Sequence, residues 1–315
     1  MSKDSVFCDV NNIVPKSKKS VKNDDSNDDD NDDCNCAPGK TYDGNTCFTL
    51  SDIIELVKAY NKYYKSVASK HIDLKWNSMK NDEKKYKKYL VDELSKRLDD
   101  VCSDQMCWLK QKFITKLDRN KANNIIDNTF RPIGPQGKFT WLNTINLDQV
   151  MTQYENDYKN FKYLGTVPLD FDIIEKEYNL SKFDYKKFIN NGITLYGTVI
   201  NFDKHNQPGS HWVAVFIDFS TGNINYFDSY GDAPPKNILN FMTNVAKIYK
   251  KIYENNPILN YNTTRHQFKN SECGVYSINF IVKSLAGQTM NDIIENVVKD
   301  DDINLCRNVY FNNKN

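Results

Sequence analysis

The chain has 315 residues, of which 39% are hydrophobic and 13% aromatic, enough for a packed core in one large domain or two smaller ones. Lys plus Arg (42) and Asp plus Glu (41) nearly cancel, so the overall charge gives no case for a specific nucleic-acid partner. No stretch approaches the roughly 20 apolar residues that span a bilayer, and the start has no apolar signal region. We therefore expect a soluble protein made in the cytoplasm, with no membrane partner.

Residues 1–37 are predicted to form a disordered charged tail. Lysines between positions 16 and 22 run into an acidic tract from Asp24 to Asp33, and apolar residues are too sparse to offset the entropy of ordering. A solvated tail is the simplest interpretation, and a docking or regulatory arm is the alternative. Order is expected to begin near Cys47.

Residues 38–130 are predicted to form a helical N-terminal module without visible site chemistry. Ser51 could cap a first helix, in which apolar residues from Ile53 to Tyr64 recur at spacings of three and four. Two further helices are expected at 82–101 and 106–117.

Residues 131–315 are predicted to form an α+β catalytic domain that starts with the Pro- and Gly-rich loop 131–137. The tetrapeptide Ser220–Asn223 is typical of a hairpin turn between two strands. The expected elements are helices at 147–161, 237–253 and 273–285, and strands at 194–201, 211–219, 224–228 and 258–261.

The eight cysteines occupy positions 8, 34, 36, 47, 102, 107, 273 and 306. In a chain of this length without a signal region, reduced thiols are the expected state. This holds also for Cys102 and Cys107, although the two could approach one another. Cys34, Cys36 and Cys47 could hold a metal ion, but no nearby histidine or fourth cysteine completes the set. We therefore expect no metal site.

Cys273 is the candidate nucleophile. It is followed by Gly274 and an apolar run that predicts a buried helix beginning at or just after the cysteine. A thiol attacks an amide carbonyl as the thiolate, a form favoured by a helix N-terminus and by a neighbouring imidazolium. The sequence thus places Cys273 where such chemistry requires it.

His211 is the candidate base, because it begins an apolar strand that can hold an imidazole in place. His71 falls in a charged helical region and His205 in a polar loop. His266 adjoins Gln267 and is the main competitor.

An imidazole needs an acceptor on its second nitrogen to fix its tautomer. Asp228 ends the paired strand and can lie beside His211 across the hairpin, whereas strand alternation points Asp218 to the opposite face. Gln267 precedes Cys273 by six residues. Its side-chain amide and the Cys273 backbone N–H are the predicted donors to the oxyanion of a tetrahedral intermediate.

These residues resemble the ubiquitin-like-protein-specific (SUMO) protease clan, to which the adenovirus maturation protease also belongs. The resemblance rests on His211-Trp212, Asp228-Ser229 and Gln267 through Glu272-Cys273-Gly274. It implies an α+β papain-like core in which His211 is the base, Asp228 its orienter, Gln267 the oxyanion donor and Cys273 the nucleophile.

A closer resemblance is to the polyprotein-processing core proteases of African swine fever virus and of giant DNA viruses of the mimivirus type. It is carried by His211-Trp-Val-Ala214, Pro234-Pro235 and Arg265-His-Gln267. The African swine fever virus enzyme has Asn where this chain has Asp228. The resemblance covers residues 140–285 well and the helical module only loosely.

In this clan, cleavage follows a Gly-Gly type motif because a tryptophan narrows the substrate tunnel. Trp212 and Trp141 are the candidate substrate-binding walls. Trp141-Leu-Asn143 resembles the family's tryptophan motif, whereas a second alignment through Asn146-Leu-Asp148 places Ile145 there and leaves Trp141 as a core aromatic.

The function implied by the resemblance is a thiol endopeptidase that cleaves viral structural polyproteins during virion maturation, in the host cytoplasm (viral factory) and in the virion. Its partner would be a polypeptide substrate, and no cofactor is expected. The sequence does not indicate activation by a peptide or DNA. A deubiquitinase or deSUMOylase acting on host conjugates shares the same chemistry, and an inactive interaction scaffold is the alternative from another class.

Overall fold

The computed structural model describes residues 8, 35–74, 82–174 and 180–312. The chain divides into two compact units, one formed by Asp25–Pro132 and the other by Met1–Asp24 with Ile133–Asn315. Most of the predicted charged tail lies outside the described residues. Residues 35–37 pair through their backbones with residues 129–131, so ordered structure begins ahead of Cys47.

The unit Asp25–Pro132 is helical, with a core formed by the inward faces of its helices. Thr49, and not Ser51, caps the first helix: its hydroxyl accepts a hydrogen bond from Asp52 N, and the Asp52 carboxylate accepts one from Thr49 N. The expected helix 106–117 is broken at Gln111, whose backbone is extended. The helices are α2 (Leu50–Tyr63), α4 (Glu83–Leu98), α5 (Gln105–Trp108) and α6 (Arg119–Asn128), with 3₁₀ turns at Ala68–Lys70 and Lys112–Lys116.

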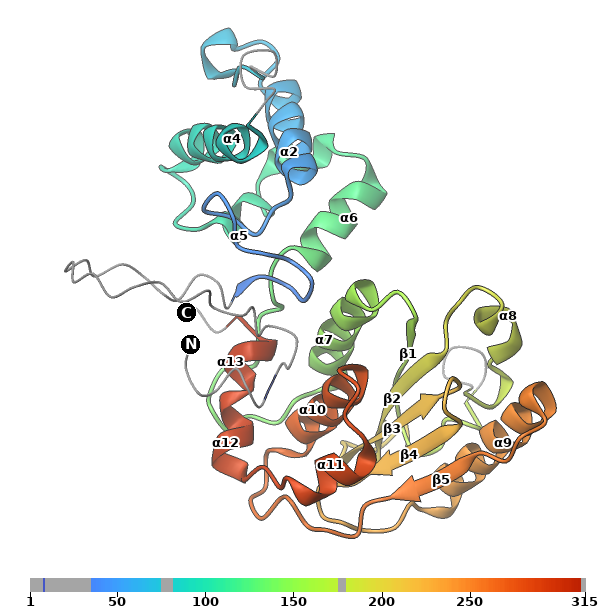
Figure 1. The fold of residues 1–315 in the computed structure, drawn as a ribbon. Coiled ribbons are helices and arrows are strands. Elements are labelled where there is room, and N and C mark those ends of the chain that lie inside the picture. The colour runs from blue at the N-terminus through green and yellow to red at the C-terminus, as the bar shows by residue number, and fades with distance from the viewer. Residues whose placement is uncertain (1–7, 9–34, 75–81, 175–179, 313–315) are drawn as a thin grey trace, which may run out of the picture. The chain divides into compact units, whose positions relative to one another are not determined.

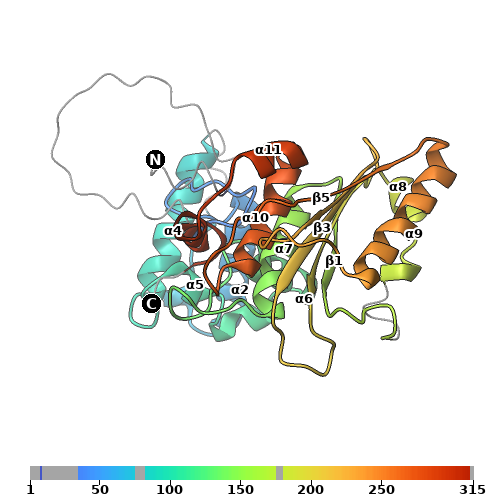
Figure 2. The same cartoon turned by 90° about the horizontal axis from the view of Figure 1, so that it is seen from below.

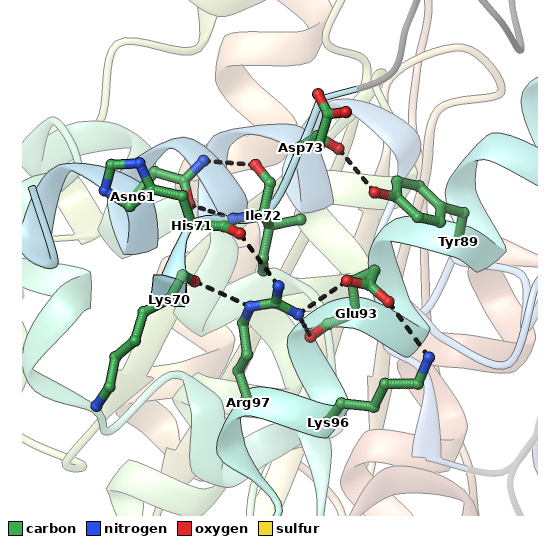
Figure 3. A network of polar contacts seen from close by, with 9 residues as sticks. All are labelled: Asn61, Lys70, His71, Ile72, Asp73, Tyr89, Glu93, Lys96 and Arg97. Carbon is green, nitrogen blue, oxygen red and sulfur yellow. Dashed lines mark hydrogen bonds and ion pairs between the residues drawn. The ribbon is translucent and has the colours of Figure 1, made fainter. Parts of the chain in front are cut away.

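A polar network joins the segment that follows α2 to helix α4 (Figure 3). The Arg97 guanidinium donates to the carbonyls of Lys70 and His71, at 2.9 and 3.1 Å, and to the Glu93 carboxylate at 2.8 Å. The Asn61 amide pairs with both backbone groups of Ile72 at 2.8 Å. Residues 71–74, which follow the 3₁₀ turn, belong to no helix or strand, so these hydrogen bonds hold this segment against α2 and α4.

The other unit contains a five-stranded sheet with its strands in sequence order. The two outer pairs are parallel, and the two inner pairs are antiparallel. In the central hairpin Ala214 pairs with Phe227 and Asp218 with Asn223. The strands are β1 (Phe161–Val167), β2 (Leu195–Asn201), β3 (Trp212–Asp218), β4 (Asn223–Phe227) and β5 (Ile258–Tyr261).

Alternation along β3 builds a core on each face of this sheet. Val213, Val215 and Ile217 pack into one core, whereas Trp212, Ala214 and Phe216 pack into the other, which includes Cys273. Helices α7 and α10 cover the second face, and α8 and α9 lie on the first (Figures 1 and 2). This confirms the predicted α+β class. The helices are α7 (Thr144–Asp157), α8 (Tyr185–Ile189), α9 (Lys236–Tyr253), α10 (Cys273–Leu285), α11 (Met290–Glu295), α12 (Asp300–Leu305) and α13 (Arg307–Tyr310), with a 3₁₀ turn at Leu180–Lys182.

The expectation of reduced thiols is wrong for six cysteines. Cys8 is bonded to Cys306, Cys36 to Cys47 and Cys102 to Cys107, and Cys273 is free. The Cys8 and Cys306 Cα atoms lie 5.2 Å apart although 298 positions separate them, so only the fold brings them together. Cys34 lies outside the described residues, and its neighbour Cys36 is committed to a disulfide. None of the described helices is long and apolar enough to cross a membrane.

Candidate active site

His211 and Asp228 form a buried pair at one end of the β3–β4 hairpin. His211 directly precedes β3 and Asp228 directly follows β4, so the hairpin places both residues at the same end of the strand pair. His211 Nε2 lies 2.6 Å from Asp228 Oδ1, and the Asp228 side chain is fully buried. A carboxylate accepts hydrogen bonds, so this contact fixes the proton on Nε2 and leaves Nδ1 free for the thiol.

The environment of His211 favours its protonated form. Burial lowers the pKa of the imidazole, but the hydrogen bonds and negative charges of Asp228 and Cys273 outweigh burial and raise the pKa to about 9. The Tyr230 ring stacks on the imidazole, with centroids 4.5 Å apart and planes 16° apart. An aromatic face attracts a cation, so this stacking also favours imidazolium.

Cys273 is the first residue of α10, where the helix has unsatisfied backbone N–H groups. Its thiol is free and buried, and Cys273 is one of the two residues that raise the His211 pKa. Gly274 allows a close approach at this point, because a Cβ there would lie 3.0 Å from Leu142 Cβ and 3.3 Å from Trp212 Cδ1. Because residue 274 has no side chain, the start of α10 can pack closely against the loop before α7 and the first residue of β3.

Gln267 is fully buried and fixed through the turn that follows Asp228. Its Oε1 accepts a hydrogen bond from Ser229 Oγ at 2.6 Å, and its Nε2 donates to Lys269 O at 3.0 Å. Its backbone N–H donates to Ser229 O at 2.8 Å. Among the described residues these bonds use one of the two Nε2 protons, which leaves the other available as an oxyanion donor.

The rival residues occupy other environments. Burial and the charge of Lys283 lower the pKa of His266 to about 4, so its imidazole is neutral at ordinary pH. The His266 ring packs edge-on against Phe227. Asp218 is used in the hairpin turn, where it accepts hydrogen bonds from Ser220 and Thr221. The carboxylate beside His211 is therefore Asp228.

The two candidate tryptophans differ in burial. Trp212 is 7% exposed, and its Nε1 donates to Leu142 O at 2.8 Å, beside Gly274. Trp141, the residue before Leu142, is 41% exposed. Trp212 is thus a fixed wall of the core beside the nucleophile, whereas Trp141 presents an aromatic surface to solvent in the adjoining loop.

Sequence reasoning missed the residues that hold Asp228 and His211 in place. The Asn262 side chain brackets Asp228, accepting from its backbone N–H at 2.8 Å and donating to its carbonyl at 2.6 Å. Tyr230 N donates to Asp228 Oδ1 at 2.9 Å, and its ring covers His211. The signal available in the sequence was the short turn from Asp228 to Gly231, where a positive φ of 81° favours glycine.

A second buried network supports the residue before the nucleophile. The Glu272 carboxylate accepts hydrogen bonds of 2.7 Å from Ser271 N, Ser271 Oγ and Asn304 Nδ2. Arg307 donates to Ser271 O and to Asn304 Oδ1, each at 3.0 Å. Asn304 belongs to α12 and Arg307 to α13, and Cys306 between them is bonded to Cys8. The chain's end thereby supports the start of α10.

Within the described part of the chain, no group of three or more His, Cys, Asp or Glu side chains could hold a metal ion. The buried His–Asp pair and the thiol at a helix N-terminus are suited to acyl transfer by a cysteine, and the buried Gln267 amide is the candidate oxyanion donor.

Replacing Gln267 tests its predicted role as oxyanion donor. We expect Gln267→Ala to lower kcat by about a hundredfold or more while leaving KM nearly unchanged, because the lost hydrogen bond forms only in the transition state. Gln267→Glu is the matched variant, since it keeps the side-chain volume and the acceptor for Ser229 but removes the N–H donor. Full turnover in Gln267→Glu would contradict the role, provided that thermal unfolding shows both variants folded.

The sequence of this chain matches the model of the Ulp1 protease family, C-terminal catalytic domain, over residues 146–312. A protein of Acanthamoeba polyphaga mimivirus that carries the name of a thiol protease is 39% identical over 290 residues, which are 89% of this chain and 93% of that protein. A cysteine protease of African swine fever virus, from the Tick/Malawi isolate, is 26% identical over 245 residues, which are 72% of this chain and 89% of that protein.

Two further comparisons concern the same viral protease. Its counterpart from the Tick/South Africa isolate carries the name SUMO-1 cysteine protease and is 25% identical over 244 residues, 72% of this chain and 89% of that protein. The crystal structure of the African swine fever virus protease is similar to this fold with a TM-score of 0.59 at 24% identity, over 73% of this chain and 90% of that chain.

Proposed function

This chain belongs to the Ulp1 protease family and is a cysteine peptidase, and we propose that it cleaves viral structural polyproteins during virion maturation. The observation that carries the proposal is the buried His211–Asp228 pair at 2.6 Å beside the thiol of Cys273 at the start of α10. The similarity to viral cysteine proteases supports a viral substrate. Its proposed places of action are the host cytoplasm, at the viral factory, and the virion.

In the proposed mechanism the Cys273 thiolate attacks the scissile carbonyl carbon and forms a tetrahedral oxyanion. Gln267 Nε2 and the Cys273 backbone N–H donate to that oxyanion. His211, protonated by the thiol, gives its proton to the leaving amine as the C–N bond breaks, and a thioester remains on Cys273. His211 then accepts a proton from water, which attacks the thioester carbonyl. The C–S bond breaks, the carboxylic acid leaves, and His211 returns its proton to the Cys273 sulfur.

The preferred cleavage site is proposed to follow a Gly-Gly type motif. The proposal is supported by the match to the Ulp1 protease family and by the position of Trp212, which lies against Gly274 beside the nucleophile. Trp212 is proposed as one wall of the substrate channel and the exposed Trp141 as the other.

Removal of ubiquitin-like proteins from conjugates is the second candidate function. It is favoured by the match to the Ulp1 family and by relatives that carry the name SUMO-1 cysteine protease. The same four catalytic residues would serve both reactions, because both hydrolyse an amide bond that follows glycine.

A direct comparison of substrates tests the proposed function. Purified full-length protein is incubated with viral structural polyprotein precursors and, in parallel, with SUMO and ubiquitin conjugates, and the new N-termini are identified by mass spectrometry. We expect cleavage of the precursors after small residues, and none by Cys273→Ala. Faster turnover of a conjugate than of every precursor would favour the second candidate function instead.

A further inference from the structure

A series of stacked planar side chains, two aromatic rings and a guanidinium, extends from the catalytic histidine to the protein surface. The Tyr230 ring lies 4.5 Å from the His211 ring, and the Arg265 guanidinium lies over the Tyr230 ring at 5.1 Å. The same guanidinium lies 5.0 Å from the Phe268 ring, which is 70% exposed. Arg265 is itself exposed, and one aromatic ring separates it from His211.

The Arg265 side chain is held in place without a charged partner. Its Nε donates to Gln267 O at 2.7 Å, and aromatic rings contact the guanidinium. In the part of the chain that the structure describes, no carboxylate forms an ion pair with it. The cation Lys269, by contrast, is paired with Asp301.

These contacts fix the plane of the Arg265 guanidinium, and no other described residue forms a hydrogen bond with its two terminal nitrogens. The edge formed by the two terminal nitrogens of a planar guanidinium matches a carboxylate in two parallel hydrogen bonds. Because aromatic faces and a backbone carbonyl already hold the arginine, little side-chain entropy is lost when such a ligand binds.

We propose that Arg265 is a specificity residue that binds an acidic side chain of the polypeptide substrate close to the scissile bond. The inference rests on the proposed peptidase site, because its ligand is part of the same substrate. Arg265 would discriminate between substrates through a Glu or Asp side chain, and Phe268 would cover the apolar stem of that side chain.

The test is cleavage profiling of the full-length enzyme with a peptide library whose C-termini are amidated, so that every carboxylate comes from a side chain. We expect wild-type protein to favour Asp or Glu at one position near the cleaved bond. Arg265→Gln should abolish that preference, and Arg265→Glu should reverse it toward Lys or Arg. For one matched pair of acidic and neutral peptides, the wild-type ratio of kcat/KM should be about five to ten, set mainly by KM, and close to one in Arg265→Gln.

Lys269→Gln is the matched control, since it removes a positive charge from the same segment while the acidic preference should persist. A structural role for Arg265 would lower kcat equally for acidic and neutral peptides, and that result would overturn the inference. Cleavage by the wild type without acidic preference would overturn it too, and leave the proposed function standing. Failure to cleave any peptide or polyprotein would overturn both.

Discussion

Cys273→Ala is expected to reduce peptide hydrolysis to the background rate. Removing the nucleophile of a comparable protease costs about a million-fold in kcat, because the remaining groups cannot form the covalent intermediate. The fold should persist, since the buried Cys273 side chain loses only its sulfur and the disulfides involve other cysteines. The measurement is a progress curve with a cleaved precursor, together with thermal unfolding.

Cys273→Ser is the matched control for this prediction. It keeps a side chain of similar size and polarity beside His211, but a hydroxyl ionises far less readily than a thiol. We expect it to be as inactive as the alanine variant, with a melting temperature within about 4 °C of the wild type. Appreciable turnover by the alanine variant would show that another group performs the attack.

Asp228→Ala is expected to lower kcat/KM by about a thousandfold or more, the range seen when the carboxylate of a catalytic triad is lost. Asp228 fixes the proton on His211 Nε2 and is one of the two groups that raise the His211 pKa to about 9. Imidazolium therefore persists in the wild type until the pH rises through about 9. In Asp228→Ala the alkaline limb of the kcat/KM profile should move to lower pH.

Asp228→Asn separates orientation from charge in this prediction. Its amide oxygen can still accept a hydrogen bond from His211 Nε2, so we expect more activity than in Asp228→Ala but a similar shift of the alkaline limb. An alkaline limb at the same pH in all three proteins would contradict the role of Asp228.

The raised pKa of His211 also affects the stability of the wild type. Protonated His211 stabilises the fold below pH ~6.5, and this contribution is lost as the pH rises through about 9.

The local patterns in the sequence predicted the elements that surround the site. Period-two alternation and the turn 220–223 predicted the β3–β4 hairpin, and the helix predicted at 273–285 has the bounds of α10. The hairpin register then brings Asp228 to His211. The hairpin, the helix and the His211–Asp228 contact depend on residues that are close in sequence or on strand alternation. They could therefore be predicted without knowing how distant parts of the chain pack.

The elements that were missed depend on distant partners. β1 was missed, because the predicted helix ended at Phe161 and no strand was predicted before residue 194. Phe161–Val167 has an irregular register around Gly165 and pairs with β2, which lies about 30 residues further along the chain. α6 contains four asparagines, which are weak helix formers, and begins at the cap Asp118. The bond between Cys8 and Cys306 joins the two ends of the chain, a proximity that no local pattern encodes.

Two residues that sequence reasoning did not assign to the site, Tyr230 and Arg265, act through contacts with aromatic rings and a backbone carbonyl. Tyr230 follows Asp228 by two positions, but its stacking on His211 depends on the course of the turn at Gly231. Arg265 was part of a recognised motif, yet its place between Tyr230 and Phe268 became visible only in three dimensions.

The most direct test of Cys273 as the nucleophile is to label the reactive side chain covalently and to identify the labelled residue. A peptide that ends in an electrophilic glycine derivative is reacted with the folded protein, and the adduct is located by tryptic digestion and mass spectrometry. We expect the added mass on the peptide Asn270–Lys283 at Cys273, with loss of activity in proportion to labelling, and no adduct in Cys273→Ala. Activity lost through an adduct at any other residue, or labelling that proceeds unchanged in Cys273→Ala, would contradict the assignment of Cys273 as the nucleophile.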